Sequence, residues 1–203
     1  MRKAEQYFLS ILRNKATSRG AFRVAAEQLT TLLAVRALEH VQMKKVPIET
    51  TLAKTTGLTF DQRIILVPIL RSGMTMVEPF LRILSDALVG VVGLRRDEKT
   101  AVAHWYYENM PPLLLTDQII VVDPMIATGG TGKQTLELLQ EKGADMTRLI
   151  YVSMVGAPEG IKTITEAFTT ITLVLAAEDS HLNEKKYIVP GLGDYGDRYF
   201  GTD

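Results

Sequence analysis

Short apolar segments alternate with amphipathic ones along most of the chain. Apolar runs rich in β-branched residues occupy 63–70, 87–94, 118–123, 148–155 and 171–177. Parallel strands that are buried on both faces lose the apolar-polar alternation, so these runs are typical of buried strands. Amphipathic patterns predict helices at 74–84, 132–142 and 158–168. This alternation predicts βαβ units, right-handed crossovers and an α/β fold with a central, mostly parallel sheet flanked by helices.

Other segments do not follow this rhythm. Residues 21–44 place apolar side chains at helical spacing with no Pro or Gly inside, which predicts a long helix that Pro47 ends. Residues 95–116 are polar and aromatic, which favours a hairpin or an excursion from the sheet. Residues 178–203 are rich in Gly and Asp and continue neither pattern. With 203 residues, the chain is expected to form a single domain.

The composition argues against several classes of protein. Basic and acidic residues number 23 each, so the net charge is zero. This balance argues against a protein whose whole surface attracts nucleic acid. The absence of Cys removes disulfides, thiolate metal sites and a cysteine nucleophile, and three His argue against an all-His metal site. The chain has no apolar run of about 18 residues, and its start lacks a secretory signal. We therefore expect a cytoplasmic protein without a membrane segment.

The segment 119–133 carries the strongest functional signal. A buried strand ends in one carboxylate, Asp123, and the small residues of 127–131 then lead into a helix. Such a loop aims bare backbone N–H groups and a helix N-terminus at one point, which favours a phosphate monoester. Because ligands of open α/β sheets bind at the carboxyl ends of strands, the site is expected in the turns after residues 70, 94, 123 and 155.

Two familiar nucleotide motifs match this chain incompletely. A Walker A loop requires Gly five residues before the Gly-Lys pair and Ser or Thr after it, but positions 127 and 134 are Ala and Gln. The run GLGDYG at 191–196 satisfies G-x-G-x-x-G, yet it lies so near the C-terminus that no helix is expected to follow. Both the P-loop and the dinucleotide interpretations are therefore rejected.

The remaining interpretation is a sugar-phosphate loop with a carboxylate placed for vicinal ribose hydroxyls. An apolar strand, an acid and ATGGT resemble the signature loop of the type I phosphoribosyltransferases, which bind 5-phosphoribosyl-1-pyrophosphate (PRPP). The form VDPMxATGG resembles the uracil phosphoribosyltransferase branch. VPILRSGM (67–74), RDEKTAVAHWYY (96–107), APEG (157–160) and LNEKKYIVPGLGDYGDRYFGT (182–202) resemble the same branch. The resemblance covers nearly the whole chain.

The resemblance implies a type I phosphoribosyltransferase fold with a β-arm excursion and a C-terminal hood. It implies a single domain over 1–203, with a core of about 60–178 and a hood from the N-terminal segment and 179–203. It implies the reaction of uracil with PRPP to give UMP and pyrophosphate, with Mg²⁺ as cofactor. Because the loop holds one acid, Mg²⁺ is expected to be held largely by substrate and water, and no residue is assigned to a metal.

The resemblance also assigns residues to PRPP. Asp123 holds the ribose hydroxyls, the loop after it cradles the 5′-phosphate, and Arg71 contacts pyrophosphate with a planar charged fork. The complete PRPP set is Arg71, Ser72, Gly73, Arg96, Asp123, Pro124, Met125, Ile126, Ala127, Thr128, Gly129, Gly130, Thr131 and Asp194.

The C-terminal segment is assigned to the base. The main chain of Ile188 and Gly193 matches the hydrogen-bonding edge of uracil, with Tyr187 packing nearby, and the uracil set also includes Gly191 and Leu192. Asp123, Arg71 and Asp194 are the candidate catalytic residues. Three roles stay open for Asp194: binding of magnesium-linked water, ordering of the ribose, or removal of the N1 proton.

Two alternatives and several properties stay open. The first alternative is a PRPP- or UMP-sensing pyrimidine regulator, RNA-binding and with little or no turnover, which would need a one-sided basic patch. The second is a sister enzyme that acts on a purine base. The resemblance implies a homodimer or a higher homo-oligomer. It also brings GTP into consideration as an effector, and the sequence does not decide that point.

Overall fold

The computed structural model describes residues 2–96 and 103–202. The helices are α1 (Lys3–Arg13), α2 (Arg19–Leu38), α3 (Val77–Leu81), α4 (Gly130–Glu141), α5 (Pro158–Ala167) and α6 (Tyr195–Phe200), with 3-10 turns η1 (Ser72–Met76) and η2 (Met146–Arg148). The strands are β1 (Met43–Glu49), β2 (Lys54–Phe60), β3 (Ile64–Leu70), β4 (Leu88–Val89), β5 (Val91–Arg96), β6 (Ala103–Asn109), β7 (Gln118–Val122), β8 (Met125–Ile126), β9 (Leu149–Gly156), β10 (Thr172–Glu178), β11 (His181–Leu182) and β12 (Ile188–Val189).

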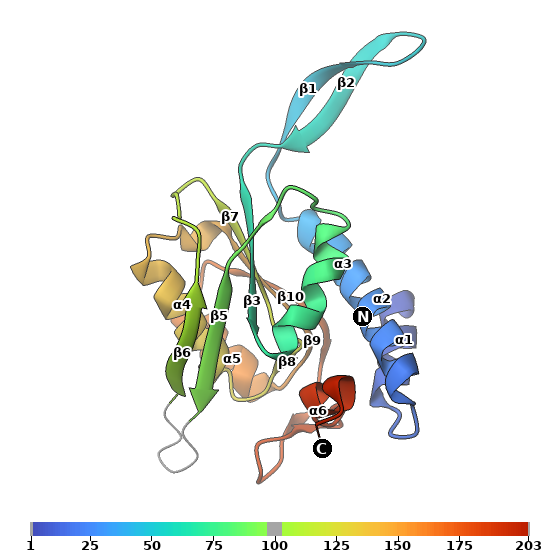
Figure 1. Cartoon of the computed structure of the whole chain (residues 1–203), viewed down its shortest axis with the longest axis vertical. Coiled ribbons are helices and arrows are strands. Elements are labelled where there is room, and N and C mark those ends of the chain that lie inside the picture. Colours follow the sequence, from blue (N-terminus) through green and yellow to red (C-terminus); the bar gives the residue numbers. More distant parts are fainter. Residues whose placement is uncertain (1, 97–102, 203) are drawn as a thin grey trace.

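A central sheet organises the molecule (Figure 1). Its strands run in the order β10-β9-β7-β3-β5-β6, with β4 beside β3 and β8 beside β9. All pairs in it are parallel except β5 with β6. The predicted α/β fold with a mostly parallel sheet is therefore confirmed, and β5–β6 forms the antiparallel excursion expected after residue 94.

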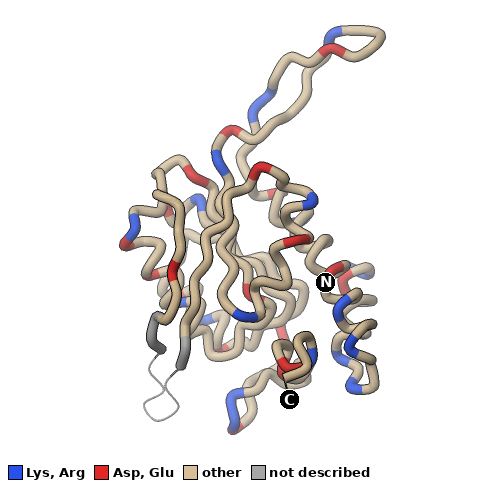
Figure 2. The backbone as a smooth tube through the Cα atoms, viewed as in Figure 1, with Lys and Arg blue, Asp and Glu red and all other residues tan. Residues whose placement is uncertain are grey.

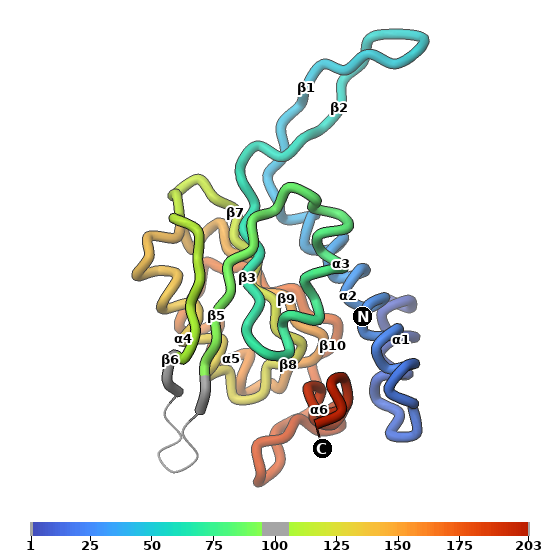
Figure 3. Tube along the Cα trace, viewed as in Figure 1, coloured from blue at the N-terminus to red at the C-terminus, as the bar shows by residue number. Residues whose placement is uncertain are grey.

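Helices cover both faces of this sheet, which gives three layers (Figure 3). Side chains of β3 alternate between two apolar cores: Ile64 and Leu66 pack with the N-terminal helices, whereas Ile65 and Val67 pack with α4 and α5. All residues of β3 except its last are buried. This burial on both faces explains why the strand has an unbroken apolar run rather than an alternating pattern.

The helix predicted over 21–44 is shorter than expected, because α2 ends at Leu38. Residues from Met43 onward instead form β1, which pairs with β2 in a two-stranded hairpin. Two effects work against a longer helix: the residue before Pro47 is biased away from helical geometry, and pairing with β2 satisfies the backbone groups of β1. The sequence pattern predicted neither this hairpin nor α1.

Two further predictions were only partly right. The helix expected over 74–84 is the turn η1 followed by the short helix α3. Pro79 is tolerated because it lies in the first turn of α3, where backbone N–H groups have no partner within the helix. The strand expected over 87–94 divides at Gly90, whose N–H donates to the carbonyl oxygen of Leu66. A Cβ at Gly90 would overlap the side chain of Met110.

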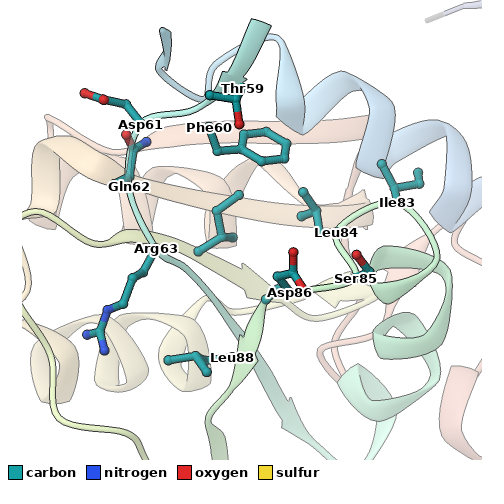
Figure 4. Close-up of a pocket in the computed structure, with 12 residues that line it drawn as sticks. Thr59, Phe60, Asp61, Gln62, Arg63, Ile83, Leu84, Ser85, Asp86 and Leu88 are labelled. Atoms are coloured by element: carbon teal, nitrogen blue, oxygen red, sulfur yellow. The ribbon is translucent and has the colours of Figure 1, made fainter. Parts of the chain in front are cut away.

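The two ends of the sheet differ in character. The β1–β2 hairpin projects from one end, whereas α6 and the loops after β3 and β7 gather at the other (Figure 1). A cavity of about 620 Å³ lies at the hairpin end, between the residues leading into β3 and the α3–β4 connection (Figure 4). Because ligands of such sheets bind at the carboxyl ends of the strands, the opposite end is the candidate site.

Candidate active site

The loop between β7 and α4 forms a closely packed cradle. Gly129 has φ +78°, and a Cβ there would overlap the carbonyl oxygen of Gly160 in α5. Gly160 in turn presses against the carbonyl oxygen of Ala127. Glycine is therefore required on both sides of this contact. Helix α4 begins directly after it, where the N–H of Lys133 donates to the carbonyl oxygen of Gly129 at 2.8 Å.

The first turn of α4 leaves backbone N–H groups without helical partners, and the positive end of the helix dipole adds to their attraction for an anion. A small hollow of about 100 Å³ lies over this turn, lined by Asp123, Met125, Ile126, Ala127, Thr128, Gly129, Gly130, Thr131, Gly132 and Tyr151. The hollow therefore brings most of the predicted phosphate residues together.

Pro124 and Ile126 support the loop from below. Both are buried, and their carbonyl oxygens accept hydrogen bonds from the main chain at the end of β9 and at Ala157. These two residues therefore fix the loop to the sheet. Met125 and Ala127 are partly buried and Thr131 is exposed.

Asp123 is the only carboxylate lining the hollow among the described residues. Its Oδ2 lies 3.5 Å from the hydroxyl of Tyr151, which is buried beneath the loop. Burial raises the pKa of Asp123 to about 7, against smaller lowering effects of the Met125 N–H and the Tyr151 hydroxyl. A carboxylate poised near neutrality beside an anion cradle is typical of a functional site.

A second loop, after β3, meets the first. Gly73 is required there because a Cβ would lie 2.5 Å from the carbonyl oxygen of Val122, the last residue of β7. The Leu70–Arg71 peptide bond is cis. The guanidinium of Arg71 is half exposed, lies 5.3 Å above the ring of Phe200 and is 3.9 Å from Oδ1 of Asp197. The side chain of Arg71 therefore connects the loop after β3 to α6.

Helix α6 packs on this second loop. The hydroxyl of buried Tyr195 and the Oγ1 of Thr75 lie 2.7 Å apart, and a Cβ at Gly196 would lie 3.2 Å from Oγ of Ser72. Asp194 caps the helix, accepting a hydrogen bond from the N–H of Asp197 at 3.0 Å. The expectation that no helix follows GLGDYG is therefore wrong, although α6 has only six residues.

The segment before α6 is a compact loop with unusual backbone conformations. The Val189–Pro190 bond is cis, and Gly191 and Gly193 have φ of +60° and +80°. Ile188 is buried, and Tyr187 is about half exposed. The N–H and the carbonyl of Gly191 are both hydrogen bonded to side chains, and Leu192 is buried in the core. Gly191 and Leu192 thus shape the loop, while Gly193 is exposed.

Comparison with known proteins identifies this arrangement. A sequence model of the family described as uracil phosphoribosyltransferase matches residues 2–202. The chain belongs to the uracil phosphoribosyltransferase family. Curated family members from Lactiplantibacillus plantarum and Finegoldia magna are 41% and 42% identical to it over 97% and 96% of the chain, and the matches cover 94% and 92% of those proteins.

Solved structures bear on the fold of this uracil phosphoribosyltransferase family member. The AQ2163 protein from Aquifex aeolicus superposes with a TM-score of 0.91 at 30% identity, covering 100% of this chain and 97% of that one. A hypoxanthine phosphoribosyltransferase from Trypanosoma cruzi gives a TM-score of 0.51 at 10% identity over 79% of this chain and 76% of that one, which shows a shared fold alone. The predicted phosphoribosyltransferase fold is confirmed.

One predicted PRPP residue of this uracil phosphoribosyltransferase family member cannot be placed in the site. Arg96 ends β5, and its side chain lies outside the described part of the structure. Within the described residues, no cluster of three or more His, Asp or Glu could hold a metal ion. Among the described residues that line the cradle, Asp123 is the one carboxylate.

Sequence reasoning missed three residues that shape this family member's site: Arg13, Asp179 and Arg198. Asp179 follows β10, and its carboxylate binds both Arg13 and the N–H of Gly191. Arg198 donates to the carbonyl oxygen of Leu192 at 2.6 Å. The acidic pair Glu178–Asp179 that follows the apolar run 171–177 was a signal available for Asp179. The sequence carries no local signal for its partner, because Arg13 is 166 positions away.

Proposed function

We propose that this protein transfers the 5-phosphoribosyl group from PRPP to uracil, giving UMP and pyrophosphate. In this reaction N1 of uracil bonds to C1 of the ribose, the bond from C1 to pyrophosphate breaks, and the N1 proton is released. The observation that carries the proposal is the meeting of three elements at one end of the sheet: the anion cradle, the Arg71 loop and the C-terminal loop. Family membership over the whole chain supports it.

The cradle is proposed to bind the 5′-phosphate of PRPP. The free N–H groups at the start of α4 and the hydroxyls of Thr128 and Thr131 supply donors. Asp123 accepts hydrogen bonds from the two ribose hydroxyls when it is ionised. Its partly buried position gives those bonds a lower-dielectric setting than the surface would, which strengthens them.

Arg71 is proposed to bind the pyrophosphate group. Its guanidinium is permanently charged, and its fork of donors fits phosphate oxygens. The contacts of its guanidinium with Asp197 and Phe200 of α6 support this role, because they hold the charge at the same end of the sheet as the cradle. Neutralising the departing charge and holding both reactants in place supply the catalysis, and no covalent nucleophile is required.

Magnesium is proposed as the cofactor. The described residues contain no preformed carboxylate cluster, so the donor set fits an ion that arrives with the diphosphate and keeps most of its water. When bound, Mg²⁺ neutralises part of the diphosphate charge. Asp123 is the residue placed to contact it or one of its waters.

The base is proposed to bind against the C-terminal loop. Main-chain groups of Ile188 and Gly193 would pair with the carbonyl and N3–H groups of uracil, with Tyr187 at the rim. Cytosine presents the opposite pattern at two positions, because its N3 is an acceptor and its C4 amino group is a donor. It would leave site groups unpaired, which disfavours it by roughly 10⁴-fold. Asp194 directly follows this loop and caps α6, so its carboxylate lies between the proposed base loop and the helix that contacts Arg71.

The deciding experiment measures pyrophosphate release from PRPP and Mg²⁺ with uracil, cytosine or hypoxanthine. Release with uracil alone is expected. Release with hypoxanthine would indicate a sister enzyme for purines. PRPP-dependent thermal stabilisation without release for any base would indicate a ligand-sensing regulator. Basic and acidic residues are interspersed along the described chain (Figure 2), which gives the RNA-binding form of that alternative no support.

We also propose that the protein forms a homo-oligomer. The β1–β2 hairpin leaves the body of the molecule and exposes Leu52, Leu58 and Ile48, with 94%, 66% and 43% of their surfaces accessible. Apolar groups on such an arm are typical of a surface that packs against another chain. Light scattering of the wild type and of Leu58→Asp tests this. A monomeric wild type would contradict the proposal.

No helix within the described ranges is long and apolar enough to span a membrane.

A further inference from the structure

A buried ion pair outside the proposed reaction centre holds the C-terminal loop, residues 188–193, which is called the base loop below. Asp179 lies directly after β10 with 7% of its surface exposed. Its Oδ2 accepts hydrogen bonds from Nη1 of Arg13 at 2.9 Å and from the N–H of Gly191 at 2.9 Å. Its Oδ1 accepts a further bond from Nη2 of Arg13. The carboxylate thus connects the last residue of α1 to the C-terminal loop.

Arg13 also binds the carbonyl group of Gly191, the residue whose N–H is held by Asp179. Nη1 of Arg13 donates to the carbonyl oxygen of Gly191 at 2.8 Å. Both polar main-chain groups of Gly191 are therefore fixed by one pair of side chains. Position 191 requires glycine, because φ is +60° and a Cβ would overlap the carbonyl oxygen of Ile188.

Arg198 extends this control by one residue. It donates to the carbonyl oxygen of Leu192 at 2.6 Å, to that of Asn14 at 2.8 Å and to that of Leu12. Its guanidinium lies 4.4 Å above the ring of Phe22. The peptide groups that precede Gly193 are thus anchored to the N-terminal helices.

Gly193 differs from the two residues before it, whose main-chain groups are held by side chains. Gly193 makes no hydrogen bond to another described residue, and it is exposed. Its N–H and carbonyl are free to meet a ligand, while the direction in which they point is set by the two fixed residues before it. A main-chain recognition surface needs such external support because it has no side chain to adjust.

We propose that Arg13 and Asp179 are positioning residues for the base: their ion pair sets the direction of the main-chain groups that read uracil. This proposal rests on the proposed function and deepens it. Neither residue touches the base. Breaking the pair would leave a buried charge and a buried N–H without their partner, so the loop would move to regain hydrogen bonds. A misplacement of about 1 Å is enough to weaken productive binding by a large factor.

Asp179→Asn tests the proposal, because it keeps the side-chain size but removes the charge and one acceptor. We expect KM for uracil, at saturating PRPP, to rise about tenfold or more, as expected for an unpaired buried group. KM for PRPP should stay within about twofold of wild type, since the cradle does not contact the pair. Hydrogen exchange of residues 188–194 should become faster.

Glu5→Gln is the matched control. Glu5 is also a buried carboxylate on α1, with 1% of its surface exposed, and it also pairs with an arginine, Arg36, at 3.0 Å. Arg36 binds the carbonyl oxygen of Leu175 in β10 rather than the base loop. A comparable loss of melting temperature is expected, with no change in KM for uracil.

Arg13→Lys is the second variant, and it keeps the charge but loses the planar fork that reaches Asp179 and Gly191 together. An intermediate KM for uracil is expected, and this variant carries the test if Asp179→Asn does not fold. The proposal is overturned if both variants keep the wild-type KM for uracil, if KM for PRPP rises equally, or if Glu5→Gln raises KM for uracil as much. A wild type without uracil turnover would instead overturn the proposed function.

Discussion

The two glycine-containing loops of the site are built in different ways. The cradle at 123–131 is continuous: a strand, a loop and a helix follow one another, and Gly129 and Gly160 allow their close packing. The C-terminal loop at 188–193 has no such local frame. Its peptide groups are held by side chains from the other end of the chain and from the end of β10. One loop is stabilised by its neighbours in sequence, and the other by tertiary contacts.

Two loops with similar glycine patterns are therefore stabilised by different kinds of contact. The cradle uses a helix N-terminus, so its donors already converge on one point. In the proposed function the C-terminal loop presents single main-chain groups in set directions, and side chains from outside the loop hold its peptide groups. Perturbations of the first loop should therefore affect PRPP, and perturbations of the second should affect uracil.

Asp123→Ala should have the largest effect. Loss of a charged acceptor for two ribose hydroxyls, at about 1.5–3 kcal/mol each, should lower kcat/KM for PRPP by about 100-fold or more while the fold survives. Steady-state kinetics and circular dichroism check this. Asp145→Ala removes a partly buried carboxylate that caps η2, and it should leave the kinetics unchanged. A wild-type kcat/KM in Asp123→Ala would refute the ribose role.

Gly129→Ala and Gly193→Ala test the two loops separately. Both glycines have positive φ, so each substitution imposes strain of about 1–2 kcal/mol. Gly129→Ala should raise KM for PRPP about tenfold or more, because the new Cβ also overlaps Gly160. Gly193→Ala should raise KM for uracil with little change for PRPP. The two-loop distinction fails if both variants affect both substrates equally.

The pH dependence of PRPP use tests the electrostatics of the cradle. Because burial raises the pKa of Asp123 to about 7, kcat/KM for PRPP should fall as the pH drops below 7 and the acceptor becomes protonated. A profile that is flat between pH 5 and 8 would contradict this assignment. Asp123→Asn should remove that part of the profile.

The same shift has a consequence for stability. Between the ordinary Asp value of 3.8 and about 7, the folded protein binds a proton that the unfolded chain does not. The stabilising contribution is therefore complete below pH 3.8 and is lost as the pH rises toward 7. Denaturant titrations of wild type and Asp123→Asn should differ in this window and in this direction.

Tyr151→Phe should have the smallest effect. The Tyr151 hydroxyl lowers the pKa of Asp123 by hydrogen bonding at a long 3.5 Å, so its removal should move the kinetic midpoint upward. At neutral pH the loss of kcat/KM for PRPP should be only about two- to threefold, as expected for a weak bond. An unchanged midpoint would show that the hydroxyl does not act on Asp123.

Sequence reasoning was most successful where structure is local. The strands of the sheet follow from apolar runs, and the end of α4 follows from Gly143. There the N–H of Ala144 donates to the carbonyl oxygen of Leu139 and that of Gly143 to Gln140, as a positive-φ terminal glycine allows. The cradle could be located for the same reason, since its parts are consecutive.

Sequence reasoning was least successful where tertiary contacts determine the structure. Nothing in the pattern of 43–60 indicates that it leaves the helix to form a hairpin, since β1 is exposed and carries little apolar periodicity. The side chains that support the base loop were equally hard to predict. Nothing in the local sequence distinguishes Arg13 and Arg198 from other charged residues. Their roles depend on partners that only the folded chain brings near.

The ties between the chain ends determine when the enzyme becomes complete during its synthesis. Arg13 can bind its partner Asp179 only after a further 166 residues have been translated. The carbonyl oxygen of Leu12 can accept from Arg198 only after a further 186. At 5–20 residues per second the ribosome needs roughly ten to thirty seconds to cover the first interval. The residues of the cradle are translated before those of the C-terminal loop. A nascent chain can therefore fix the proposed uracil-binding loop only after Asp179 and Arg198 have both been made.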